Sequence, residues 1–178
     1  MRLVESGLRQ TFIIELDRFA DDRGYFARTW SGDDLAPHGL TARLAQCSMS
    51  FNAKAGTLRG MHYQVAPYEE AKIVRCTRGA LYDVVIDLRR DSATYRQWIG
   101  VELTPDNGRM LYVPEGCAHG FQTLLDDTEI SYFISESYQP DYARGVRWND
   151  PAFNVSWPDA PGRRIMAVRD ETYPDFTG

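Results

Sequence analysis

A histidine and an arginine stand three residues apart in the stretch GTLRGMHYQ, residues 56–64. Histidine is the side chain that titrates near neutral pH, so His62 is a candidate for taking and returning a proton in a reaction. The stretch is typical of a β-strand, in which residues two apart share a face. His62 is therefore expected on the same face as Gly60 and Gln64, with Arg59 on the opposite face. A hydrogen-bonded core histidine is an equally good interpretation of this stretch alone.

A second histidine, His119, ends a spaced pattern of turn residues. Residues 108–119 follow the pattern G-x5-P-x-G-x2-H, and residues 56–62 follow G-x5-H. These spacings resemble the second motif and the start of the first motif of the cupins, which are jelly-roll barrels also called double-stranded β-helices. In metal-binding cupins the first motif continues as H-x-H and then a glutamate, whereas Gln64 takes the second histidine position here.

The histidine count bears on whether a metal is expected. The chain has three histidines, His38, His62 and His119, and His38 stands beside Pro37 in an expected loop. Catalytic metals usually take about three protein ligands. Two histidines without a matching carboxylate make a poor metal site, so we expect no metal ion. The two histidines are then free for acid–base chemistry.

Length and composition limit the class of protein. A chain of 178 residues with 43% hydrophobic and 25% charged residues is expected to form one globular domain over residues 1–178. A net charge of −5 argues against a nucleic-acid binder. No apolar run is long enough to span a membrane, and the first residues lack the apolar core of a signal peptide. Cys47, Cys76 and Cys117 lack a metal-like spacing, so we expect reduced thiols and a cytoplasmic protein.

Short strands separated by glycine and proline dominate the rest of the chain. Strands or extended runs are expected over residues 11–16, 40–49, 58–64, 72–77, 80–88, 97–103, 110–113, 118–125 and 128–135, with a turn leading into an aromatic strand over 21–30. Ser31 is expected to cap a short helix over 33–36 that Pro37 ends. The apolar run at 84–86 predicts a strand buried on both faces. The pattern predicts an all-β sandwich or barrel with short peripheral helices.

Several longer motifs then converge on one family. RGMHYQ at 59–64, Lys72, DVVIDLR at 83–89, VPEGCAHGF at 113–121 and WNDP at 148–151 resemble the dTDP-4-dehydrorhamnose 3,5-epimerase family of cupins. The resemblance extends from the turn at 22–24 to Asp170. It implies a cupin jelly-roll and an isomerase of sugar-nucleotide and dTDP-rhamnose biosynthesis, in the supply of lipopolysaccharide O-antigen. The implied reaction inverts C3 and C5 of a nucleotide-linked 4-keto-6-deoxyhexose, without a cofactor.

The resemblance also assigns catalytic roles. It implies that His62 is the base and that Asp170 orients its ring and supports its charged form. Lys72 would stabilise the enolate at the C4 oxygen, and Tyr132 would return a proton from the opposite face. From the residues alone, Lys72 is equally a solvated charge at a strand end. Tyr132 shares a strand face with its apolar neighbours two residues away, and the residues alone favour a packed aromatic among ten tyrosines.

Substrate contacts and assembly follow from the same resemblance. Arginine forks suit diphosphate oxygens, so the resemblance implies phosphate contacts from Arg59 and Arg23. In the family the segment from Arg23 to Phe26 enters the barrel of a second subunit, which implies a homodimer with N-terminal strand exchange. The remaining implied substrate-binding residues are Gln46, His119, Tyr138, whose ring would stack on the base, and Arg169. A solvated surface charge is the usual alternative for each arginine.

The departures from the family pattern leave alternatives open. Arg28 and Ala143 stand where the family has glutamates, Arg169 stands where it has a lysine, and residues 47–50 replace an asparagine-containing segment. Arg169 keeps the charge of that lysine, and the other departures fall where the base and the sugar would be read. A single-centre epimerase, or one for a CDP-, GDP- or UDP-linked sugar, therefore remains an alternative. A sugar-binding cupin without catalysis and a metal-dependent cupin oxygenase belong to other classes.

Overall fold

Two facing antiparallel sheets form the body of the protein in a computed structural model that describes residues 1–178. One sheet has the order β1-β2-β10-β7-β12-β5, and the other has β13-β6-β11-β8-β9. The strands are β1 (Arg2–Glu5), β2 (Phe12–Glu15), β5 (Gln46–Asn52), β6 (Leu58–Gln64), β7 (Lys72–Arg78), β8 (Leu81–Asp87), β9 (Trp98–Leu103), β10 (Met110–Val113), β11 (Cys117–Thr123), β12 (Thr128–Ile134) and β13 (Ala143–Gly145). The expectation of an all-β fold is confirmed.

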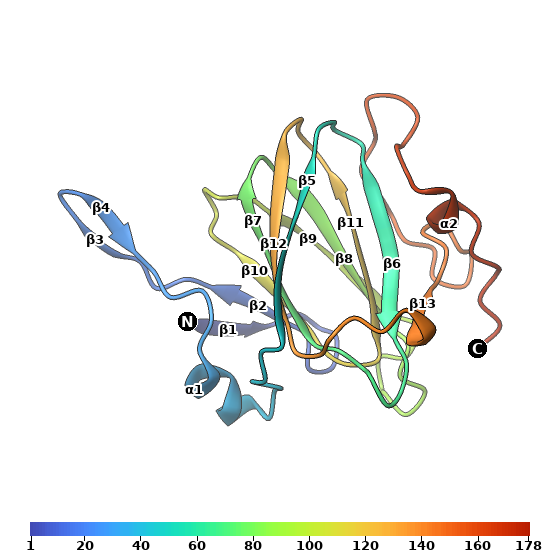
Figure 1. Ribbon diagram of the computed structural model, residues 1–178, viewed down its shortest axis with the longest axis horizontal. Coiled ribbons are helices and arrows are strands. Elements are labelled where there is room, and N and C mark those ends of the chain that lie inside the picture. Colours follow the sequence, from blue (N-terminus) through green and yellow to red (C-terminus); the bar gives the residue numbers. More distant parts are fainter.

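The other elements are short. A hairpin of β3 (Phe19–Asp21) and β4 (Gly24–Phe26) projects away from the two sheets, as Figure 1 shows. The helices are α1 (Gly32–Leu35), η1 (Ala36–His38), η2 (Pro140–Tyr142) and α2 (Val168–Glu171). The chain after β13 lies along the outside of the sheet that contains β6 (Figure 1). None of these helices has the length and apolar character needed to cross a membrane.

Apolar side chains fill the space between the sheets and also cover the outer faces of both sheets. Val74, Val85 and Ile130 belong to the inner core, which joins both sheets. Val84 and Ile86 point the other way, into a second cluster formed with residues of the chain after β13. All three residues of the run at 84–86 are fully buried, so the prediction of a strand buried on both faces is confirmed.

The expected elements differ from the observed ones mainly in short segments. β1, β3 and β13, of three or four residues each, were not predicted, because each is fixed by pairing with a partner strand. The extended run expected over 40–49 pairs as a strand from Gln46 onward, and the aromatic strand ends at Phe26. Ser31 caps α1 through its side chain, as predicted. α1 stops at Leu35, one residue earlier than expected, and Pro37 lies in the first turn of the following η1, where a missing N–H is tolerated.

A bulge in β6 overturns the predicted face of Arg59. His119 of β11 pairs with His62 and Phe121 pairs with Arg59, so two residues of β6, Gly60 and Met61, stand opposite one residue of β11, Gly120. Gly60 has a φ of +119°, and a Cβ on it would lie 2.7 Å from the Cα of Gly120. Only glycine fits this close approach. The extra residue turns Arg59 and His62 to the same side, which makes the prediction of opposite faces wrong.

Candidate active site

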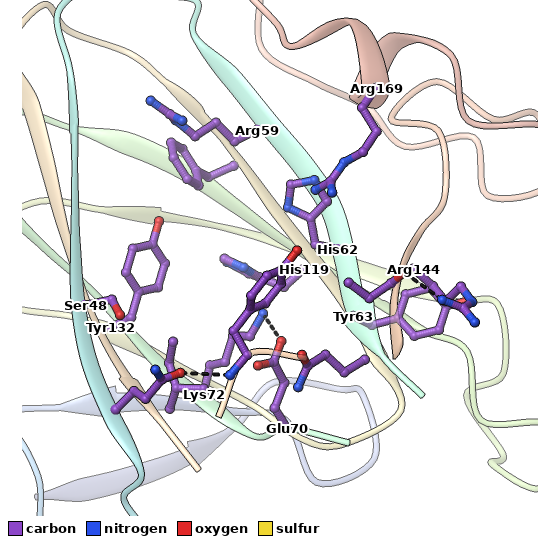
Figure 2. A pocket seen from close by; sticks show the side chains of 16 residues that line it. Ser48, Arg59, His62, Tyr63, Glu70, Lys72, His119, Tyr132, Arg144 and Arg169 are labelled. Carbon is purple, nitrogen blue, oxygen red and sulfur yellow. Dashed lines mark hydrogen bonds and ion pairs between the residues drawn. The ribbon is translucent and has the colours of Figure 1, made fainter. Parts of the chain in front are cut away.

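A cavity of about 430 Å³ lies between the two sheets, and most of the residues singled out from the sequence line it. The sheet containing β7 contributes Gln46, Lys72 and Tyr132, and the facing sheet contributes His62 and His119. Arg59, Tyr138 and Arg169 complete the predicted residues in its lining. Figure 2 shows these side chains converging on one space. His62 and Tyr132 thus stand on opposite walls of a single compartment.

His62 is held by a carboxylate from the C-terminal helix. Its Nε2 lies 2.7 Å from Oδ1 of Asp170, and the backbone N–H of Gly60 donates to Oδ2 of the same residue at 3.0 Å. Burial alone would raise the pKa of Asp170, but the hydrogen bond and charge of His62 and the bond from Gly60 lower it below its ordinary value. Asp170 therefore stays charged and fixes the ring of His62, which leaves Nδ1 available to a ligand.

His119 makes a second pair of the same kind, deeper in the wall. Its Nε2 lies 2.7 Å from Oδ1 of Asp83, which is on the neighbouring β8. Oδ2 of Asp83 is buried without a hydrogen-bond partner. Burial raises the pKa of Asp83, and the nearby His119 and Lys72 offset only part of that effect. The ring of His119 also packs edge-on against Tyr132, with centroids 6.4 Å apart.

Tyr132 can supply a proton. Its hydroxyl lies 3.2 Å from Oγ of Ser50 on the adjacent β5. Burial raises the pKa of Tyr132 well above its ordinary value, although Ser50 and Arg59 act in the opposite direction. The phenol is therefore protonated at neutral pH. A protonated phenol and a carboxylate-bound imidazole on facing walls can add and remove protons on two faces of a bound molecule.

Cationic and amide side chains line the solvent-exposed part of the cavity. Nε of Arg59 donates to Oδ1 of Asn52 at 2.7 Å, which fixes the guanidinium and leaves its other N–H groups free to meet an anion. The side chain of Gln46 accepts a hydrogen bond from the backbone N–H of Tyr138 at 3.0 Å. Arg169 lies near Asp170, with Nε 3.8 Å from Oδ1.

Two predicted substrate-binding residues lie outside the cavity of their own chain. Arg23 and Phe26 are on the projecting hairpin, where Arg23 pairs with Asp21 and Phe26 is 66% exposed. The structure of one chain therefore does not bring them to His62.

Sequence reasoning missed several lining residues. Glu70, Tyr63, Arg144 and Phe121 line the cavity, and Asp83 supports it from behind His119. Strand alternation contained a signal for Glu70, which stands two residues before Lys72. No such local signal marks Arg144, because η2 and β13, which carry it there, are too short to read.

The arrangement of histidines bears on the metal question. His62 and His119 pair with different carboxylates, and no group of three or more His, Cys, Asp or Glu side chains is arranged to hold a metal ion. All three cysteines are free thiols, and Cys76 and Cys117 are buried.

Comparisons with known proteins agree with the residue pattern. The sequence model of a family described as dTDP-4-dehydrorhamnose 3,5-epimerase matches residues 5–178. A dTDP-4-dehydrorhamnose 3,5-epimerase of Sinorhizobium fredii is 40% identical over 164 residues, covering 92% of this chain and 84% of the relative. A dTDP-4-dehydrorhamnose 3-epimerase of Streptomyces niveus is 37% identical over 172 residues, covering 96% of this chain and 82% of the relative.

A solved structure agrees as well. The crystal structure of dTDP-4-dehydrorhamnose 3,5-epimerase from Bacillus anthracis with TDP and PPi bound superimposes with a TM-score of 0.92 at 38% identity. It covers 98% of this chain and 99% of that one. The expected cupin-like jelly-roll is thereby confirmed.

Proposed function

This chain belongs to the dTDP-4-dehydrorhamnose 3,5-epimerase family, and we propose that it epimerises a dTDP-linked 4-keto-6-deoxyhexose at C3, C5 or both. The observation that carries the proposal is the placement of His62 and Tyr132 on facing walls of one cavity. Inversion of a carbon requires a proton to leave one face and another to arrive on the opposite face. A pure binding site has no need of that pair.

The proposed chemistry uses the acidity of carbons next to a ketone. Nδ1 of His62 takes a proton from C3 or C5, and the electron pair of the broken C–H bond moves into an enolate at the C4 oxygen. Asp170, which accepts from Nε2, stabilises the resulting imidazolium. The ammonium group of Lys72 stabilises the negative oxygen. Tyr132 then protonates the carbon from the other face, and the cycle closes when His62 releases its proton to water and Tyr132 recovers one from water.

The nucleotide and diphosphate are assigned to the open part of the cavity. Arg59, whose fork is fixed by Asn52, is proposed to bind a phosphate, with Arg169 nearby. The half-exposed ring of Tyr138 is proposed to stack on the base, with Gln46 holding its backbone.

The projecting hairpin supports a proposal about assembly. Phe19, Tyr25 and Phe26 expose aromatic surface on β3 and β4, away from the core (Figure 1). An exposed aromatic patch of this kind is typical of a contact with another molecule. We propose a homodimer in which the hairpin of one subunit brings Arg23 and Phe26 to the cavity of the other.

Deuterium uptake tests the reaction. The enzyme is incubated in heavy water with dTDP-4-keto-6-deoxyglucose, and label at C3 and C5 is followed by NMR. We expect label at one or both carbons, which also separates a two-centre epimerase from a single-centre one such as the 3-epimerase relative. No label at either carbon would contradict the proposal for this substrate.

Ligand stabilisation tests the nucleotide. Thermal unfolding is measured with dTDP, CDP, GDP and UDP at matched concentrations, because a ligand that binds only the native state raises the melting temperature. We expect the largest rise with dTDP. A larger rise with another nucleoside diphosphate would assign a different nucleotide base to the substrate and would leave the proposed proton transfers unchanged.

A further inference from the structure

The ammonium group of Lys72 already has a partner in the cavity wall. Its Nζ lies 2.6 Å from Oε1 of Glu70, and the two side chains are only 12% and 9% exposed. Both residues line the cavity, and Figure 2 shows their contact beneath His119. Residues two apart in an extended chain share a face, so this contact follows from the local backbone.

The backbone between the two charges is fixed. The N–H of Ala71 donates to Oγ of Ser135 at 2.8 Å, and the N–H of Ser135 donates to the carbonyl of Ala71 at 2.9 Å. Ala71 is itself buried. The backbone at Glu70 and Lys72 is therefore held in place, and only their side chains remain free to change conformation.

A second carboxylate competes for the lysine. Oδ2 of Asp83 is buried and has no hydrogen-bond partner. Lys72 is among the charges that act on Asp83, although the two form no ion pair in this structure. A buried, unpartnered carboxylate oxygen is a strong acceptor for an ammonium group on a flexible four-carbon chain. Without Glu70, we expect the Lys72 ammonium group to turn toward this unpartnered oxygen of Asp83.

We propose that Glu70 is a positioning residue that holds the Lys72 ammonium in the cavity, away from Asp83, for the enolate oxygen. This inference rests on the function proposed above. Lysine has three N–H donors, so the bond to Glu70 leaves two for a substrate oxygen. The role is one of placement, since Glu70 exchanges no proton with the substrate.

The energetic consequence falls on the chemical step. The C4 oxygen becomes strongly negative only as the proton leaves carbon, so a well-placed ammonium group stabilises the transition state more than the bound ketone. Binding of the nucleotide diphosphate depends on other side chains, with Arg59 among them. Displacement of Lys72 should therefore lower kcat and leave KM nearly unchanged.

The test compares Glu70→Gln with the wild-type enzyme and with Glu69→Gln. Glutamine keeps the shape of Glu70 but removes the charge that anchors Lys72, so we expect kcat to fall about tenfold with KM within about twofold. Glu70→Ala should lower kcat further. Glu69 is exposed and outside the cavity lining, so the control removes one negative charge from the same loop and should keep wild-type kcat.

A double-variant cycle shows whether the effect passes through the lysine. In a Lys72→Ala background, Glu70→Gln should cause no further loss of kcat, because there is no ammonium group left to place. Independent, multiplied losses would overturn the inference, as would unchanged kcat in both Glu70 variants or a change confined to KM. A wild-type enzyme that neither turns over nor exchanges label would instead overturn the proposed function, which keeps the two failures distinct.

Discussion

Two histidine–carboxylate pairs stand in the wall of one cavity, each with Nε2 and Oδ1 2.7 Å apart. Their surroundings differ. The His62 side chain is 33% exposed, and its partner Asp170 comes from the distant C-terminal helix. The His119 side chain is 6% exposed, and its partner Asp83 is on the adjacent strand of the same sheet.

The environment gives the two carboxylates opposite tendencies. Burial disfavours the charged form of both carboxylates. A backbone N–H donates to Asp170, and the pKa of Asp170 is lowered. One oxygen of Asp83 has no donor, and the pKa of Asp83 is raised. The first pair is built to keep a negative charge beside a ring that a ligand can reach. The second is a packed part of the wall. Equal geometry in the pair does not imply an equal role.

The largest expected difference between the pairs is in proton abstraction. His62→Asn removes the proposed base, so we expect label exchange and turnover to fall by about 10³-fold or more. His119→Asn should cost about tenfold or less, because His119 packs against Tyr132 without exchanging a proton with substrate. Rates are measured by NMR on variants whose circular dichroism matches the wild type. Equal losses in the two variants would remove the distinction between the pairs.

The next effect concerns the wall facing His62. Tyr132→Phe removes the proposed acid but keeps the ring that packs against His119. We expect net inversion to slow by about 10²-fold, while label exchange persists because His62 can still remove and return a proton on its own face. Product stereochemistry and label are measured in the same sample. Full inversion by this variant would assign the acid to another group.

The smallest expected effect is on the free energy of unfolding, which the charges of Asp170 and Asp83 change in opposite directions. The depressed pKa of Asp170 means that its charge stabilises the native state above the unfolded value of about 3.9, a contribution lost as pH falls through the folded pKa. Asp170→Asn should therefore lower the free energy of unfolding at pH 7, by about 1–3 kcal/mol, with the deficit shrinking toward pH 3.

The raised pKa of Asp83 has the reverse consequence. Its ionisation opposes folding, so the penalty is absent below about pH 3.9 and grows as pH rises through the folded pKa. Asp83→Asn should match or exceed wild-type stability at pH 7, because an asparagine oxygen can still accept from His119. Urea unfolding of both variants at pH 3 and pH 7 checks the signs. Destabilisation of Asp83→Asn at pH 7 as large as that of Asp170→Asn would contradict the comparison.

Local sequence patterns predicted much of the fold and several of the residues that line the cavity. Alternating strands and the buried run at 84–86 predicted an all-β fold, and the spacing around His62 and His119 indicated a cupin. The same alternation failed at Arg59, because the bulge at Gly60 depends on how closely β11 approaches. The short strands at 2–5, 19–21 and 143–145 were missed because each is fixed by its partner strand.

The sequence by itself determined the residue types: a histidine, a lysine and a tyrosine on strands, with an aspartate near the end of the chain. Tertiary structure decided which of them meet. Asp170 reaches His62 across 108 positions of sequence, and Asp83 of β8 pairs with His119 of the neighbouring β11 in the wall of the same cavity. Pairing between distant segments depends on how the sheets close and how the C-terminal chain returns over them, and no local rule of alternation contains that information.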